Sequence, residues 1–337
     1  MSAHFNPKLE LFKFSLNPNN ISSCSFKDFI IKKLALKNTI SDQDAFRALF
    51  EYFMRDLNVG VSLDEKNNKV ISLPIDSVNR YKAFKPIIKS KTFVFEGVIS
   101  GGKYNERSIL MDVTNKQNSS EIKNIQSIQK YHYIFVYMPP KDYEGYIMVH
   151  NNNMADSITS SMKKYLERIF LLNGYYKKIK FERYCPDEIK RIFQEGLTLQ
   201  SISYSTRKTN DIISNNTIID TMNGFSVKVQ FTPKDQTLTS CFFEPVANMF
   251  KQLRLSLGNK GKELSNFERI QVTASNHNLS CTKTYDLYVD NNNVIPVINL
   301  EDKVTILADG TPDFNELRQY CEKIFETNIK TESSLIN

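Results

Sequence analysis

Residues 131–150 read YHYIFVYMPPKDYEGYIMVH, and this stretch decides the fold class. Residues 131–138 are almost continuously apolar and aromatic, which predicts a strand buried on both of its faces. The run Pro139-Pro140-Lys141-Asp142 ends this strand, and residues 145–150 form the next one. Because so short a connection favours antiparallel pairing, we expect an antiparallel sheet with the first strand near its centre.

Further helices and strands are predicted on both sides of this stretch. Towards the N-terminus, Phe46, Leu49, Phe50, Phe53 and Leu57 recur at helical spacing after Ser41, a predicted N-cap. We expect strands at residues 9–16, 92–99, 107–113, 175–183, 197–205, 225–231, 267–273, 281–289, 294–298 and 304–307, and helices at residues 154–172, 186–196, 242–257 and from about 312 onward. The predicted class is α+β, with mainly antiparallel sheets and packed helices.

A polar stretch with few aromatic residues, 206–223, separates two groups of predicted elements. A chain of 337 residues has the length of about two domains. We therefore expect an N-terminal α+β domain at residues 1–208 and a C-terminal α+β domain at residues 220–337.

Composition and motif searches exclude several classes of protein. Hydrophobic residues make up 41% and charged residues 24% of the chain, which excludes wholesale disorder. The apolar runs are far shorter than the roughly 18–20 residues of a membrane-spanning helix. The N-terminus carries no signal segment, and the five scattered cysteines fit reduced thiols, so we expect a cytoplasmic protein. We expect no cofactor and no metal site, since His132 and His150 are too few to ligate a metal alone.

Basic residues are concentrated in one segment of the chain. The net charge is +7, and residues 161–208 hold eleven basic and five acidic residues, whereas residues 299–337 hold four basic and eight acidic ones. Such asymmetry indicates a polyanion partner or a self-complementary contact in a homodimer, the alternative being ordinary solvated surface. The candidate phosphate-binding residues are Lys163, Lys164, Arg168, Lys177, Lys178, Lys180, Arg183, Lys190, Arg191, Arg207 and Lys208. Four tyrosines interleaved with them, Tyr165, Tyr175, Tyr176 and Tyr184, are candidates for base stacking or for sheet packing.

The sequence contains no diagnostic catalytic motif. GxGxxG, Walker A, GxSxG and HExxH patterns are all absent, which favours a protein that is not an enzyme. One alternative stays open: a Mg²⁺-dependent nuclease in which Asp112 and Glu121 hold the metal and Lys123 orients the attacking water. That reading requires the three side chains to lie close together.

The segment 131–170 resembles the RexA family of phage-exclusion proteins and related bacterial anti-phage defence proteins. The resemblance lies in an apolar strand (YIFVYM), a turn, a second strand after a glycine (GYIMVH) and a helix preceded by Ser157-Ile158. It implies a cytosolic, dimeric protein that binds DNA without sequence specificity, and it carries no catalytic residue over.

Charge and resemblance together lead to one main expectation. We expect a non-sequence-specific DNA-binding protein of bacterial anti-phage defence, a sensor or effector subunit that contacts phosphates through a basic surface. The alternatives are the Mg²⁺-dependent nuclease and a protein-interaction subunit of a defence complex. The expected partners are DNA, a second copy of the chain and a partner subunit.

Overall fold

The computed structural model describes residues 7–16, 24–74, 84–105, 108–112, 114, 117–152, 156–172, 179–186, 197–206, 227–232, 269–276, 281–290, 293–296, 298–301 and 303–330. These residues fall into two compact units. The first unit joins the chain up to Arg183 with the chain from Ile298 onward, and the second runs from Tyr184 to Val297. The bounds differ from the predicted 1–208 and 220–337, because the C-terminal segment packs with the N-terminal one.

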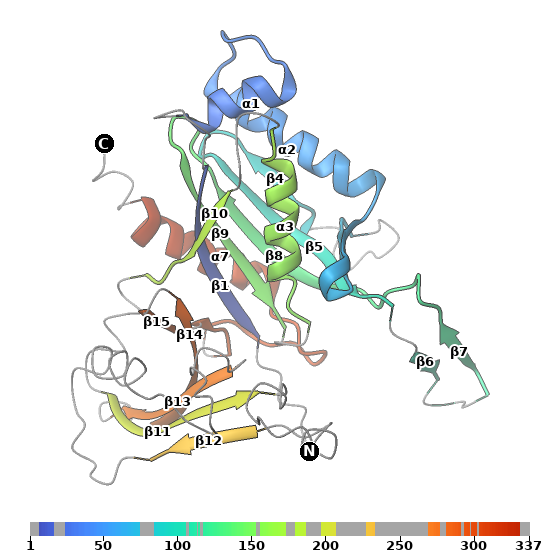
Figure 1. The fold of residues 1–337 in the computed structure, drawn as a ribbon, viewed down its shortest axis with the longest axis vertical. Helices are drawn as coiled ribbons and strands as arrows, with labels where there is room; N and C mark the ends of the chain where they lie inside the picture. Colours follow the sequence, from blue (N-terminus) through green and yellow to red (C-terminus); the bar gives the residue numbers. More distant parts are fainter. Residues whose placement is uncertain are drawn as a thin grey trace, which may run out of the picture. The chain divides into compact units, whose positions relative to one another are not determined.

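An antiparallel sheet forms the centre of the first unit (Figure 1). Its strands follow the order β10-β1-β9-β8-β5-β3-β2, with β16 paired to β1 and β4 paired to β5. The bounds are β1 Lys8–Ser15, β2 Ser62–Asp64, β3 Lys69–Ser72, β4 Ile87–Lys89, β5 Val94–Lys103, β8 Lys130–Tyr137, β9 Glu144–Asn151, β10 Lys180–Arg183 and β16 Ile298–Asn299. As predicted, the apolar strand β8 lies in the middle of the sheet and pairs antiparallel with β9.

Helices cover both faces of this sheet. One face packs against α1 (Phe26–Leu34), α2 (Asp42–Val59) and α3 (Thr159–Ile169), and its core includes Ile134 and Val136 of β8. The other face packs against α7 (Phe314–Ile324), with the ring of Phe135 lying 5.5 Å from that of Phe325. A π-helical turn, η5 (Phe325–Ile329), follows α7, and a 3-10 turn, η1 (Glu65–Asn67), links β2 to β3. Because alternate residues of a strand point to opposite faces, burial on both sides explains why β8 is apolar throughout.

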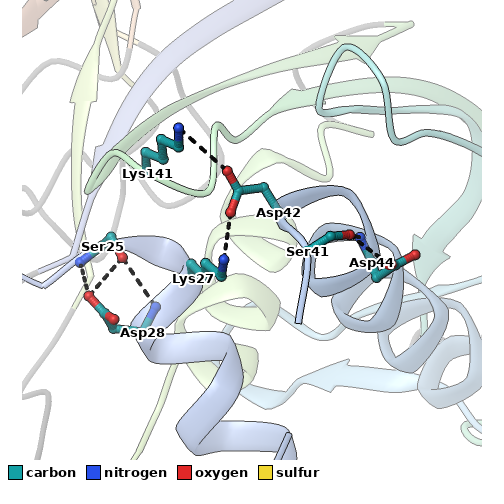
Figure 2. Close-up of polar contacts among 7 residues, drawn as sticks. All are labelled: Ser25, Lys27, Asp28, Ser41, Asp42, Asp44 and Lys141. Carbon is teal, nitrogen blue, oxygen red and sulfur yellow. Dashed lines mark hydrogen bonds and ion pairs between the residues drawn. The ribbon is translucent and has the colours of Figure 1, made fainter. Parts of the chain in front are cut away.

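Serine residues cap the first two helices (Figure 2). In α1 the hydroxyl of Ser25 accepts a hydrogen bond from the backbone N–H of Asp28 at 3.2 Å, and the Asp28 carboxylate accepts one from the N–H of Ser25 at 3.1 Å. Ser41 caps α2 in the predicted position. Asp42, at the start of α2, forms an ion pair with Lys27 of α1 at 2.7 Å. These contacts hold the two helix N-termini side by side.

Replacing Ser25 with alanine is expected to lower the free energy of unfolding by about 1 kcal/mol, because the N–H of Asp28 loses its acceptor and the Asp28 carboxylate loses the hydrogen bond from the Ser25 hydroxyl. Urea unfolding followed by circular dichroism measures the change. Ser41→Ala is the matched comparison, since Ser41 caps α2 without a reciprocal bond from its own N–H. An unchanged midpoint in Ser25→Ala would contradict the role given to this cap.

The second unit contains an antiparallel five-stranded sheet among its described residues. The strand order is β12-β11-β13-β14-β15, with bounds β11 Leu197–Thr206, β12 Val227–Phe231, β13 Arg269–Asn276, β14 Cys281–Asp290 and β15 Asn293–Pro296. A register shift between Leu199 and Ser201 interrupts the pairing of β11 with β13. The predicted helices at 186–196 and 242–257 lie outside the described residues.

The structure corrects two expected strands and adds one helix that was not expected. The strand expected at 92–99 continues as β5 through residues 100–102 to Lys103. Ile306 forms only an isolated bridge to Pro312, so the expected strand at 304–307 is absent from the described residues there. The helix α1 has only two turns, and its apolar residues show too little periodicity to be recognised in the sequence. Within the described parts of the chain, no helix is both long and apolar enough to cross a membrane.

Candidate nucleic-acid interface

The structure describes five of the eleven expected phosphate-binding residues. Lys163, Lys164 and Arg168 lie on α3, and Lys180 and Arg183 lie on β10. The other six lie outside the described residues: Lys177, Lys178, Lys190, Arg191, Arg207 and Lys208.

The lysines of α3 already interact with other side chains of the first unit. The ammonium of Lys163 lies 3.6 Å from the centre of the Phe12 ring, a cation–π contact. Lys164 forms an ion pair with the buried carboxylate of Asp64. Burial alone would raise the pKa of Asp64, but hydrogen bonds from Asn67, Lys164 and Ser161 and the Lys164 charge lower it below its usual value. The charge of Lys164 therefore stabilises a buried carboxylate.

Arg168 and the two cations of β10 also have acidic partners. Arg168 binds Asp56 of α2 at 2.6 Å, Arg183 binds the buried Glu10 at 3.2 Å, and Lys180 pairs with Glu182. Each described member of the expected basic surface thus faces a carboxylate or an aromatic ring of the same chain. A phosphate would have to displace these partners, so these five residues offer less positive potential than their number suggests.

Tyr165 does not serve as a stacking platform for bases. Its side chain is buried, and its hydroxyl donates a hydrogen bond to the backbone carbonyl of Phe53 at 3.2 Å. It therefore belongs to the core between α2 and α3. Tyr175 and Tyr176 lie outside the described residues.

Glu121 of the nuclease alternative lies in a two-stranded hairpin, β6 (Ser108–Met111) and β7 (Ser119–Ile122), whereas Asp112 directly follows β6 and Lys123 directly follows β7. Glu121 is the register partner of Ile109, so Asp112 lies three residues beyond that position, about 10 Å away. Side chains alternate along a strand, which places Asp112 and Glu121 on opposite faces of the hairpin. The Asp112 carboxylate accepts hydrogen bonds from the N–H and hydroxyl of Thr114 instead. The hairpin therefore does not bring the three residues into one metal site.

The two histidines approach each other but form no metal cluster. His132 and His150 are fully buried on β8 and β9, with ring centres 6.1 Å apart. Burial lowers the pKa of His132 to about 4 and that of His150 well below its usual value. Among the described residues, no three His, Cys, Asp or Glu side chains are placed to hold a metal ion.

A different set of cations comes together at one corner of the sheet. Lys69 begins β3, Lys103 ends β5 and Lys130 begins β8, and these three strands are neighbours in the order β8-β5-β3. The register places Lys69 directly opposite Lys103, and Lys130 opposite Gly101. Like charges directly opposite one another destabilise a sheet. We call the three lysines and the nearby Asp156 the lysine corner.

Lys103, Lys130 and Asp156 of the lysine corner line a hollow of about 250 Å³. Gly101, Gly102, Lys103, Lys130 and Asp156 contribute to its lining, together with Ile122, Gln126 and Ile128. A Cβ atom at Gly102 would collide with the backbone carbonyl of Ile128, and one at Gly101 would lie 2.6 Å from Cγ2 of Ile158. Only glycine at these two positions lets the segment before β8 and the start of α3 approach the strand.

Positive charge exceeds negative charge in the lysine corner. Lys130 pairs with Asp156 at 2.5 Å, and Lys69 donates a hydrogen bond to the backbone carbonyl of Ser157. Burial and the neighbouring charge of Lys103 lower the pKa of Lys69. The α3 helix begins at Thr159, and its N-terminus adds partial positive charge beside Asp156. The carboxylates of Asp64 and Glu10 also act on Lys69, but Lys164 and Arg183 pair with them. Counted together, these five cations and three carboxylates leave a formal surplus of two positive charges.

Charge density along the sequence could not reveal the lysine corner, because its lysines come from three separate segments. The sequence feature that could have indicated the site is Gly101-Gly102-Lys103 at the end of a predicted strand. Glycines in a strand let another segment of backbone approach closely. A larger hollow of about 410 Å³ is lined by Tyr52, Arg55, Asp56, Val59, Gly60, Val61 and Arg168. It lies at the C-terminal ends of α2 and α3, whose partial negative charges disfavour anions.

Comparison with protein-family models and with curated proteins finds no match to this chain. The fold and the lysine corner together define an α+β protein, mainly antiparallel, with a positively charged corner on its central sheet.

Proposed function

We propose that the protein binds DNA through phosphate groups, without strong sequence preference, and that the lysine corner is the principal contact. The observation that carries this proposal is the pairing of Lys69 opposite Lys103 with Lys130 on the next strand. An arrangement of like charges that costs folding stability is explained when an anionic partner binds there. The phosphate backbone is such a partner.

Lysine chemistry favours phosphate contact over base reading. An ammonium group acts as a point charge and lacks the planar fork with which arginine recognises guanine. Each phosphate that it neutralises releases condensed counterions, so the resulting affinity is sensitive to salt and insensitive to sequence. Lys177, Lys178, Lys190, Arg191, Arg207 and Lys208 remain candidate phosphate contacts.

We propose a cytoplasmic role in bacterial anti-phage defence, as a sensor or effector subunit. This part rests on the resemblance of residues 131–170, which span β8, β9 and α3. A homodimer and a partner subunit belong to the same proposal.

The test is fluorescence anisotropy with labelled duplex DNA at several salt concentrations between about 50 and 200 mM. The variant Lys103→Gln/Lys130→Gln is expected to bind about tenfold more weakly and to lower the slope of log K against log salt by about 2. Lys37→Gln is the control, because Lys37 is an exposed lysine between α1 and α2 that does not line the hollow. An equal loss of DNA affinity in the control, or no loss of affinity in the double variant, would refute the assignment of the lysine corner as the principal DNA contact.

A second comparison addresses the segment 161–208. Lys163→Gln/Lys164→Gln is expected to change the salt slope less than the lysine-corner variant does, because both side chains already have partners in the fold. Addition of Mg²⁺, with the products separated on a gel, checks the nuclease alternative. Cleavage that disappears in Asp112→Asn would restore that alternative.

A further inference from the structure

The β6–β7 hairpin, which we call the arm, exposes an unusual set of side chains. Ile109, Leu110 and Met111 are consecutive on β6 and are 71%, 60% and 50% exposed. The two strands form a sheet of their own and project from the ends of β5 and β8 (Figure 1). Ile125, in the segment that returns to β8, is 89% exposed.

Both faces of the arm are apolar along β6. Side chains alternate along a strand, so Ile109 and Met111 lie on one face and Leu110 lies on the other. Their register partners on β7 are Glu121, Ser119 and Ser120, which are too polar or too small to cover them. An isolated two-stranded ribbon is marginally stable in water, and contiguous exposed apolar side chains mark an interaction site. The exposed apolar side chains of the arm therefore mark it as a binding site for a partner.

The charge around the arm favours a polyanion as that partner. The chain leaves the sheet after Lys103, forms the arm and returns to the sheet at Lys130, so the segments on either side of the arm begin or end in the lysine corner. Residues 101–130 carry five basic and three acidic side chains in the sequence. A two-stranded ribbon fits a groove of duplex DNA, and Ile, Leu and Met are side chains that DNA-bending proteins insert between base pairs.

We propose that the arm enters a groove of duplex DNA and wedges one or more of Ile109, Leu110 and Met111 between neighbouring base pairs, which kinks the duplex. The lysine corner then holds the phosphates at the base of the arm. The small side chains of Ser119 and Ser120, opposite Met111 and Leu110, keep the two-stranded ribbon narrow. This inference rests on the proposed function, since it requires that the partner be DNA.

The experiment uses the full chain and a duplex of about 30 base pairs, labelled at both ends for energy transfer and carrying 2-aminopurine at several steps. Wild-type protein is expected to shorten the end-to-end distance and to raise 2-aminopurine fluorescence, because an inserted side chain unstacks bases. Ile109→Ser/Leu110→Ser/Met111→Ser is expected to lose both signals and to bind about tenfold more weakly at equal salt. The salt slope is expected to stay unchanged, because no lysine is altered.

The matched control is Val59→Ser/Val61→Ser/Leu63→Ser, which removes three equally exposed apolar side chains from the region of α2 and β2. It is expected to bend and unstack DNA as the wild type does. Urea unfolding of both triple variants checks that they fold. Substitutions at exposed sites of this kind are expected to change the free energy of unfolding little.

Three outcomes would overturn the proposal, and they separate it from the proposed function. DNA that is bound but neither bent nor unstacked refutes the wedge while leaving phosphate binding intact. Absence of DNA binding at low salt refutes both. Sedimentation velocity that shows self-association lost in the arm variant, with DNA binding unaffected, assigns the arm to a protein partner instead.

Discussion

Replacing Phe53 with alanine is expected to lower the free energy of unfolding by about 4 kcal/mol. Phe53 is fully buried on α2, and its ring centre lies 5.0 Å from that of Phe95 on β5 and 4.8 Å from that of Tyr165 on α3. The ring therefore joins three elements of the core. Its removal loses buried apolar surface and leaves a cavity that the two helices and the sheet cannot close fully.

Urea unfolding at neutral pH measures this effect. Phe53→Leu, which keeps most of the volume, is expected to cost about 1 kcal/mol. Tyr52→Ala is the control on the same helix, because Tyr52 lies partly exposed and outside the centre of the core. A Phe53→Ala variant no less stable than Tyr52→Ala would show that the interface of α2, β5 and α3 is not a major source of stability.

Acidification is expected to destabilise the protein through its buried histidines. In the unfolded chain His132 takes up a proton near its ordinary pKa of 6.5, whereas burial lowers the pKa to about 4 in the folded protein. Asp156 opposes this lowering, and Lys130 and Lys69 add to it. The unfolded state therefore binds more protons between these values. The stabilisation is complete above pH 6.5 and is lost as the pH falls towards 4.

For His132 alone the loss amounts to about 3 kcal/mol, and the lowered pKa of His150 acts in the same direction. His132→Gln removes the titrating group, so its free energy of unfolding is expected to fall less between pH 7 and about 4.5 than that of the wild type. Urea unfolding across this range, with His150→Gln in parallel, makes the comparison. Equal losses in the wild type and in both variants would place the acid sensitivity in the carboxylates.

The candidate site illustrates why charge along the sequence is a weak guide to charge on a surface. Residues 161–208 hold the highest density of basic residues, yet Lys164, Arg168 and Arg183 each bind a carboxylate from a distant segment. Lys69, Lys103 and Lys130 lie in segments without a marked charge bias, and strand register brings them together. Coulomb interactions depend on distance in space, which the order of residues does not reveal.

The sequence by itself determined the α+β class, the antiparallel pairing of β8 and β9 and the helical character of α2 and α7. These features depend on apolar periodicity, short connections and capping residues, all of which are local. Only the tertiary structure decided that residues 298–330 pack with the N-terminal unit, that the cations of α3 are paired and that three lysines share one corner. Those features depend on pairing between strands and on packing between segments far apart in the chain, and no local pattern encodes them.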